Sequence, residues 1–456
     1  MAWRSPSFLL LVGGGIASAF LYVLNFDITP LVQQLGLIGP HGDALAVYPL
    51  LFFLLFALYL LAVAVIFRKR PGPNLVGVIL GFAVLFRVAL LLSPPALSSD
   101  VYRYVWDGRV QTAGISPYLY APSAQELAPL RDEEIFPHIN RRDVPTIYPP
   151  GAQMLLGFSA VIFPDSVTGL KLIMILFDIA TIFLILRVLK KTGIRSDRVV
   201  LYAWSPLVIF EVAGSGHLEA AMLPFVLLAL LARMDERPLL AGTALGVAAL
   251  IKLYPAVLFP ALYKRRERMF PLAFAATILL GYLPYLYGAG DRVLGFLPAY
   301  FGPWEDFNVG LRYFVTSALA TLTTSPRPIA MLLVTALLSA VAVYILRQRQ
   351  DEAFLWHGYL MVSAYLLFLP TSFHPWYLIW ILPFLCLYPS WGWLYLSGAI
   401  ALSYLKYAQG APIVPLGIRL VEFVPLYVLL GIEAVRHRRL HLGPRETMTF
   451  MMEKPQ

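Results

Sequence analysis

Apolar runs recur along the whole chain and are separated by short polar segments. A helix rises about 1.5 Å per residue, so a run of roughly 20 residues crosses the ~30 Å hydrocarbon core of a bilayer. We therefore expect an all-α polytopic membrane protein with about 14 (12–14) transmembrane helices in a single integral membrane domain, 1–456. The predicted spans are 7–26, 45–67, 75–94, 150–164, 167–187, 199–213, 218–234, 239–262, 270–287, 327–346, 353–371, 376–388, 391–407 and 419–435.

Two of these runs permit a second topology. The run at 150–164 is short for a span, and the proline in "KLYP" (252–255) disfavours an unbroken helix over 239–262. The alternative makes the first run re-entrant and folds the second into a hairpin. The turn "GSGHLE" (214–219) is cytoplasmic in the fourteen-span topology, which we prefer, and outside in the alternative.

Three polar segments are extracytoplasmic in both topologies. They are the loops 95–148 and 288–326 and the turn "SFHPWY" (372–377). We therefore look for chemistry first in these segments.

Composition and charge agree with a membrane protein. Apolar residues make up 59% of the chain, charged residues 13%, and the net charge is +9. The basic residues form short clusters, "RKR" at 68–70, "KRRER" at 264–268 and "RHRRLH" at 436–441, which are typical of cytoplasmic anchors. A nucleic-acid partner is not indicated, because such a site is more often one continuous basic face. The single cysteine, Cys386, excludes a disulfide within the chain.

At the start of the first long loop, the sequence changes within about ten residues from apolar to rich in acids, arginines and aromatics, in "LLLSPPALSSDVYRYVWDGRVQTAGISPYLYAP" (90–122). Its start predicts a short amphipathic helix on the membrane surface. In a purely structural interpretation, Tyr and Trp mark the interface and Arg103 with Asp107 forms an ordinary i,i+4 ion pair. In a catalytic interpretation, the acids and arginines act on a substrate. The loop alone favours neither.

Charges inside the predicted spans favour the catalytic interpretation. They include Arg87, Lys171, Asp178, Glu211 and Lys252. Each costs about 2.5 to 3.5 kcal/mol at a helix centre on insertion scales, so such residues face a partner or a polar cavity. Lys171 and Asp178, two turns apart, are expected to pair. Arg87 and Lys252 need a phosphate or a carboxylate from another helix.

One carboxylate with nearby cations is suited to displacement of a sugar from a polyprenyl phosphate. The attacking hydroxyl requires a general base, and the departing phosphate requires positive charge but no proton. Glycoside hydrolysis, in contrast, normally uses two carboxylates. Asp100, at the outer end of the third predicted span, is the expected base.

Aromatic residues and further cations extend this candidate site. In the loop 288–326, Trp304, Phe307, Tyr313 and Phe314 are suited to cover a lipid or stack on a sugar, and Arg312 to hold phosphate. An interfacial loop helix explains any one of them equally well. His374, followed by a proline and two aromatics, offers a hydrogen-bond donor at the outer end of a span.

The motifs "SSDVYRYVWDGRVQTAGISPYLY", "TIYPPGAQMLLG", "KLYPAVLF" and "FHPWYLIWILPF" resemble the GT-C superfamily of integral membrane glycosyltransferases. The chain is most similar to the polyprenyl-phosphate-mannose-dependent mannosyltransferases of glycosyltransferase family 87 and their GPI-anchor relatives. The resemblance implies a seven-helix module at 75–287 with a catalytic loop at 95–148 and Asp100 as base. It also implies that 288–326 helps to enclose the donor and that 327–456 forms C-terminal helices.

The chain departs from that family in one respect. Many members have paired acids in the first loop, whereas Ser99 and Val101 flank a single Asp100. We therefore expect no cofactor, and a divalent metal is possible but not indicated. The absence of a Gly-rich nucleotide loop also favours a lipid-linked donor.

Together, the residues and the resemblance predict a hexosyltransferase that moves a sugar from a polyprenyl-phosphate donor to a lipid or glycan acceptor, and the resemblance implies that this sugar is mannose. The enzyme would be a multi-pass protein of the cell membrane with its active site on the extracytoplasmic side. A lipid or solute transporter or flippase is the alternative, and a structural assembly subunit is a third. The expected donor-binding residues are Arg87, Arg103, Tyr148, Lys252, Arg312 and His374, and the expected acceptor-binding residues are Tyr102, Trp106, Asp107 and Trp376.

Overall fold

The computed structural model describes residues 6–35, 44–68, 75–300, 307–348, 353–368, 372–411 and 413–440. These residues form helices and connecting loops, with no strand among them. The longer helices are α1 (Pro6–Leu24), α3 (Ala44–Arg68), α4 (Leu75–Leu91), α5 (Asp100–Thr112), α6 (Pro150–Ile162), α7 (Val167–Lys191), α10 (Glu219–Met234), α11 (Pro238–Ile251), α13 (Met269–Ala289), α15 (Leu311–Leu319), α16 (Pro326–Arg347), α17 (Phe354–Phe368), α19 (Trp391–Ala399) and α21 (Leu416–Leu440).

Short helical segments connect the longer ones. The short α-helices are α2 (Thr29–Gln34), α8 (Val200–Ala203), α9 (Pro206–Ile209), α12 (Phe259–Leu262), α14 (Leu297–Tyr300), α18 (Leu382–Leu385) and α20 (Leu405–Ala408). One π-helix, η6 (Phe210–Gly214), follows α9. The 3-10 turns are η2 (Asn25–Ile28), η3 (Gln125–Leu130), η4 (Phe136–His138), η5 (Ser196–Val199), η7 (Tyr254–Leu258), η8 (Gly290–Leu294), η10 (Pro375–Trp380) and η11 (Ile400–Tyr404).

Five described helices are long and apolar enough to cross a membrane, or six if a bent pair counts as one span. They are α1, α3, α7, α13 with its continuation to Tyr300, and α16; the bent pair is Pro206–Gly214 with α10, at an angle of 120°. Over the described residues the predicted all-helical architecture is confirmed, and the apolar helices agree with a membrane protein. The count of about fourteen spans is not, because many predicted spans are short or broken helices.

The prediction of one unbroken span over 239–262 is wrong. Helix α11 ends at Ile251, and Lys252 has extended backbone angles of φ −140° and ψ 137°. Pro255 then lies in the 3-10 turn η7. A proline has no amide N–H and collides with the preceding turn, so the sequence "KLYP" ends the helix. The break agrees with the alternative topology, and it places the lysine at a helix end.

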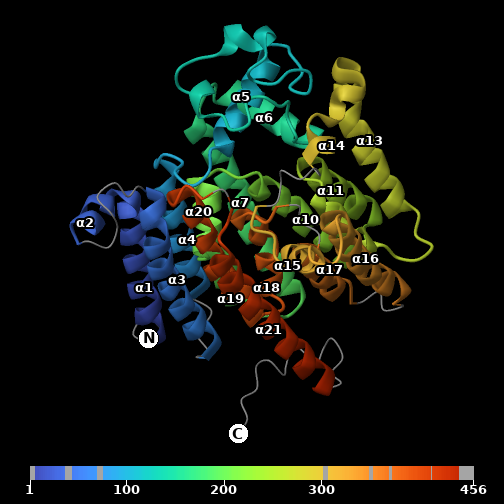
Figure 1. The fold of residues 1–456 in the computed structure, drawn as a ribbon. Helices are drawn as coiled ribbons and strands as arrows, with labels where there is room; N and C mark the ends of the chain where they lie inside the picture. Colours follow the sequence, from blue (N-terminus) through green and yellow to red (C-terminus); the bar gives the residue numbers. More distant parts are fainter. Residues whose placement is uncertain are drawn as a thin grey trace.

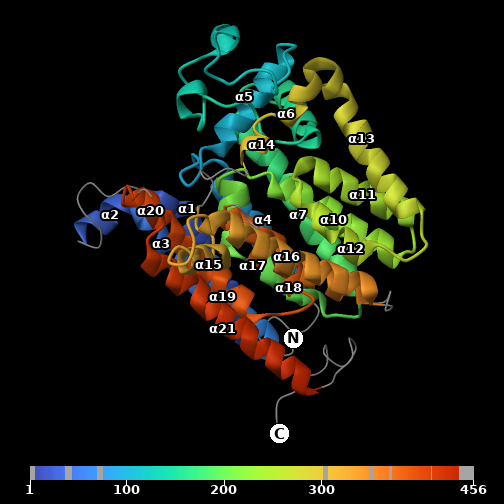
Figure 2. The same cartoon turned by 45° about the vertical axis from the view of Figure 1, so that its right-hand side comes forward.

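Helices α5 and α6, with the loop that joins them, lie together at one end of the molecule in both views (Figures 1 and 2). The start of α1 and the end of α21 lie at the opposite end (Figure 1). Gly108 of α5 allows the close contact with α6, because a Cβ there would lie 2.6 Å from the Leu156 carbonyl oxygen. The two helices therefore form one unit above the helix bundle.

Candidate active site

A cavity of about 920 Å³, here called the polar cavity, opens between several helices and loops. It lies between the start of α5, the loop that follows α5, the break after α11, and the turn that leads into η10. The charged, histidine and amide side chains that line it are Asp100, Arg103, His138, Asn140, Arg141, Lys252 and His374. Segments far apart in sequence thus bring acids, cations and aromatic rings to one place.

Asp100 is the carboxylate that opens onto this cavity. It is the first residue of α5, after Ser99 at the N-cap position, so the positive end of the helix dipole favours its negative charge. Asn140 donates a hydrogen bond to Oδ1 at 2.5 Å. Oδ2 lies 4.0 Å from Nδ1 of His217, and the side chain is 19% exposed. Asp100 is therefore held by one amide while it stays accessible to a substrate.

One turn further along α5, Arg103 is tied to the protein. Its Nε donates to Oδ1 of Asp107 at 2.8 Å, and its Nη1 donates to the carbonyl oxygens of Arg141 and Val144. Asp107 also accepts from Thr146 at 2.6 Å and from Gln153 at 3.0 Å. This network joins α5, the loop and α6, so Asp107 orients Arg103 along the cavity wall.

Lys252 also lines the cavity, at the break that follows α11. Its Nζ lies 3.1 Å from Oε1 of Glu219 and 5.2 Å from the centre of the Tyr148 ring. Tyr254 donates a hydrogen bond to the same Glu219 oxygen at 3.0 Å. The Lys252 side chain is 13% exposed, and that of Glu219 is fully buried. Lys252 is thus a cation in the cavity, balanced by a carboxylate behind the wall.

A stack of four rings forms another side of the cavity. Phe307 packs on His374 with ring centres 4.4 Å apart, His374 on Trp376 at 4.3 Å, and Trp376 on His217 at 3.9 Å. Neighbouring planes differ by 8°, 8° and 20°. Rings that stack on one another present their edges to the cavity, so this side is an aromatic wall against which an isoprenoid chain can pack.

Burial, and then the charges of Arg141, Lys252 and Lys406, lower the pKa of His374 to about 3. The unfolded histidine, with a pKa of about 6.5, binds a proton that the folded one does not. Stability should therefore fall as pH decreases from about 6.5 towards 3. The variant H374F keeps a ring in the stack and cannot titrate, so its melting temperature should decrease less between pH 7 and pH 4. An equal decrease in both proteins would contradict this assignment.

Seven of the predicted site residues line the polar cavity. They are Asp100, Tyr102, Arg103, Tyr148, Lys252, His374 and Trp376. Phe307 from the loop 288–326 also lines it, as the predicted second wall requires. Trp304 lies outside the described residues.

Arg87, Trp106, Asp107 and Arg312 do not line the cavity. Trp106 is buried against Phe136 within the first loop unit. Arg312 is buried at the start of α15. None of the four side chains lies on the cavity surface, so the predicted contacts of these residues with donor or acceptor have no counterpart in the polar cavity.

Arg87 forms an ion pair with Asp178 inside the bundle, where both side chains are fully buried. It also donates to the carbonyl oxygens of Ala83 and Ala203, each at 2.9 Å. The expected pairing of Lys171 with Asp178 is wrong: Lys171 donates to the carbonyl oxygens of Leu90 and Ser93. The sequence did not show that Asp178 is closer to a cation on another helix.

Breaking this pair should affect stability. Removing one partner of a buried ion pair costs about 3–5 kcal/mol, because the other charge stays buried. We expect R87M to lower the melting temperature of the purified protein, and R87M/D178L to recover part of the loss. The folded fraction of either variant should keep its activity. A fully stable R87M protein with impaired donor binding would instead support the sequence-based prediction of a donor contact.

Several cavity residues were not anticipated from sequence, among them Asn140, Arg141 and Tyr254, together with His217 and Glu219 just behind the wall. His217 and Glu219 belong to the turn "GSGHLE", which our preferred topology placed in the cytoplasm. The contact of His217 with Asp100 puts this turn on the same side as the first loop, so that placement was wrong. The proline after Lys252 was the signal in favour of the alternative.

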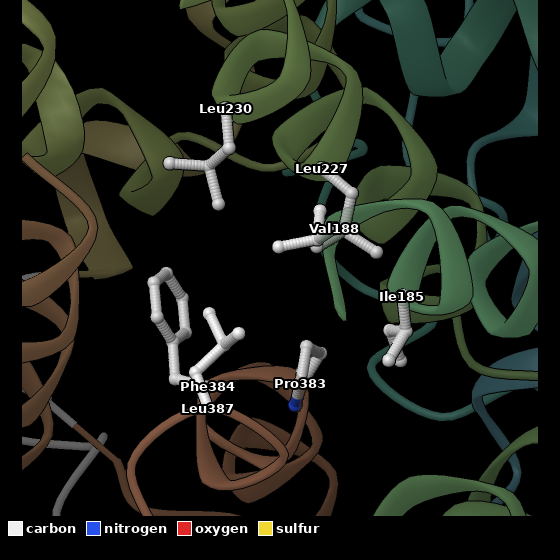
Figure 3. Close-up of a pocket in the computed structure, with 7 residues that line it drawn as sticks. All are labelled: Ile185, Val188, Leu227, Leu230, Pro383, Phe384 and Leu387. Atoms are coloured by element: carbon white, nitrogen blue, oxygen red, sulfur yellow. The ribbon is translucent and has the colours of Figure 1, made fainter. Parts of the chain in front are cut away.

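Two other spaces lack the groups that catalysis needs. A hollow of about 500 Å³ at the far end of α5, against α13, has no charged side chain in its lining. A small gap between α7, α10 and α18 is wholly apolar, as its seven labelled side chains show (Figure 3). Within the described ranges, no group of three or more His, Cys, Asp or Glu side chains is placed to hold a metal ion. The expectation that no cofactor is needed stays a prediction.

Comparison with known proteins gives one finding. Residues 6–264 match the model of a family described as alpha-(1->6)-mannopyranosyltransferase, N-terminal domain. No curated protein matches the chain significantly. The matched region includes α5, the loop that follows it and Lys252, and therefore most of the charged lining of the polar cavity.

Proposed function

Because the chain belongs to the alpha-(1->6)-mannopyranosyltransferase family, we propose that it transfers mannose from a polyprenyl-phosphate donor to a lipid or glycan acceptor. Membership of this family makes the chain a glycosyltransferase and confirms the resemblance to membrane mannosyltransferases drawn from its motifs. It also favours a transferase over the transporter and assembly-subunit alternatives. The donor, the acceptor and the mechanism are the proposal.

The proposed reaction is a single displacement in which Asp100 is the general base. An acceptor hydroxyl in the cavity gives its proton to a carboxylate oxygen of Asp100 while its own oxygen attacks C1 of the mannose. In the same step the bond from C1 to the phosphate oxygen breaks. The products are the mannosylated acceptor, protonated Asp100 and a polyprenyl phosphate monoester. A single displacement inverts C1, so an α-linked product implies a β-linked donor.

Lys252 is the cation proposed to stabilise the leaving phosphate. Phosphate gains a negative charge as the bond to C1 breaks, and a fixed cation in a partly buried cavity stabilises that charge more than water does. Arg103 and Arg141 also line the cavity and add positive potential. The phosphate leaves without a proton, so one carboxylate is enough for the reaction.

The position of the site supports an extracytoplasmic reaction in the cell membrane. The start of α1 and the end of α21 lie at the opposite end of the molecule from α5 and α6 (Figure 1). Arg68 ends α3, and Arg436 lies in the last turns of α21. Basic residues at helix ends favour the cytoplasmic side.

The observation that carries the proposal is an accessible carboxylate, Asp100, in one cavity with a lysine, Lys252, and a wall of aromatic side chains. The test is incubation of the purified protein with labelled β-mannosyl polyprenyl phosphate and a membrane lipid extract. We expect label to appear in a new lipid or glycan, with no transfer from a soluble nucleotide sugar. Transfer from the nucleotide sugar alone would overturn the proposed donor.

A further inference from the structure

His217 lies between two carboxyl groups. Its Nδ1 is 4.0 Å from Oδ2 of Asp100, and its Nε2 is 3.2 Å from Oε2 of Glu211. The ring is fully buried and is held flat against Trp376. The two nitrogens of one histidine thus face the proposed base on one side and a buried acid on the other.

Glu211 lies in the π-helix η6, an irregular turn that places the carboxyl group behind His217. Its Oε1 accepts a hydrogen bond from Tyr404 at 2.8 Å. The side chain is fully buried, and among the ion pairs of the described residues none joins it to a lysine or arginine. An isolated charge in such a place is unfavourable, so the neutral acid, which carries a proton to donate, is the favoured form.

These contacts define the direction of a hydrogen-bond chain. Tyr404 donates to Oε1 of Glu211. Oε2 of Glu211 lies 3.2 Å from Nε2 of His217, and Nδ1 of His217 lies 4.0 Å from Asp100, but neither approach is a formed hydrogen bond in this structure. A small reorientation lets the neutral Glu211 donate to Nε2, which leaves Nδ1–H to donate to Asp100. Once both contacts close, every donor in this order has an acceptor. Within this hydrogen-bond chain, the only negative charge lies on Asp100, at the cavity.

The 4.0 Å separation between His217 and Asp100 is longer than a hydrogen bond. In unliganded active sites such distances are often long and shorten when the substrate binds. Asn140 already holds Oδ1 of Asp100, so Oδ2 is the oxygen left to close the 4.0 Å gap to the imidazole. One lone pair of Oδ2 is then left for the acceptor hydroxyl.

We propose that His217 and Glu211 are positioning residues, which form a neutral hydrogen-bond chain that fixes Asp100 for proton abstraction. The inference rests on the proposed function, because it assigns Asp100 the role of base. His217 selects the orientation of the carboxylate, and Glu211 selects the tautomer of His217. Neither residue touches the reacting atoms.

The test compares two substitutions at one buried position. In E211Q the amide carbonyl accepts from Tyr404 and the amide NH₂ donates to His217, as the neutral acid does. In E211A both contacts are lost. Measured per folded protein, we expect E211A to lower kcat by about 100-fold at unchanged KM for the donor, and E211Q to stay within about threefold of wild type.

A second measurement covers the case in which E211A does not fold. The variant H217A should lose a similar share of kcat, and added imidazole should restore part of it by occupying the vacated space. His357, a largely buried histidine of α17 that does not line the cavity, provides the control. H357A should keep its activity and should not respond to imidazole.

Wild type and D100N are assayed in the same series, so that failure of the proposed function can be told apart from failure of the positioning chain. No transfer by the wild type would overturn the proposed function itself. Transfer by the wild type, with E211A and H217A as active as it, would overturn only the positioning chain. A loss in E211Q as large as in E211A would also overturn it, because a neutral donor would then not suffice.

Discussion

Replacing Asp100 with asparagine is expected to abolish mannosyl transfer while the protein stays folded in the membrane. Asparagine has the same shape, and its amide oxygen still accepts the hydrogen bond from Asn140, but it cannot take the proton of the acceptor hydroxyl. General-base catalysis contributes about 10²–10⁴ in rate, so residual transfer should be at or below the background of the assay. The measurement is labelled mannose moved per folded protein.

A matched control is available close to the same helix, α5. Asp165 accepts a hydrogen bond from Arg109 at 2.7 Å, and its side chain is 55% exposed, away from the polar cavity. D165N removes the same charge from the same side of the molecule and should transfer at nearly the wild-type rate. Wild-type turnover by D100N would disprove the assignment of the base.

The second large loss of activity is expected on substitution of Lys252. K252Q removes the cation proposed to stabilise the leaving phosphate, and loss of one such group typically lowers kcat by about 10²–10³. The substitution also leaves Glu219 buried without its cation, which weakens folding. Activity must therefore be separated from stability.

The double variant K252Q/E219Q separates them. With both charges removed, no buried charge is left without a partner, so the melting temperature should recover relative to K252Q. Transfer should stay low, because the phosphate still lacks its cation. Recovery of both stability and transfer in the double variant would show that Lys252 acts only through its pair with Glu219.

The sequence alone identified those cavity residues whose side chains are unusual in an apolar segment. Asp100 follows an apolar helix, Lys252 interrupts one, and His374 begins the turn His-Pro-Trp-Tyr; all three line the polar cavity. A charge or a polar ring in a lipid-compatible segment is unfavourable unless it faces a partner or a polar cavity. These positions therefore indicated a functional site from the sequence alone. The helical class followed from the length of the apolar runs, roughly 20 residues each, which matches the thickness of a bilayer.

The partners of those residues were not predictable, because they lie on distant segments. Arg87 was expected to bind phosphate, yet its carboxylate partner Asp178 is 91 residues away. Likewise Asp107 was expected to contact the acceptor, but Thr146 and Gln153 enclose it. His217 was missed because an unbroken helix over 239–262 would have placed its turn on the other side of the membrane.

The short helices α6 and α11 have a consequence for biogenesis. At 13 and 14 residues they rise about 20 Å, less than the ~30 Å hydrocarbon core. They are in contact, and a Cβ on Gly151 of α6 would lie 2.8 Å from Cβ of Leu250, the second-last residue of α11. During synthesis α6 leaves the ribosome well before α11, so its docking surface is incomplete while α7 and α10 insert. The mature arrangement of Asp100 and Lys252 can therefore form only late, after α11 has been made and has joined α6.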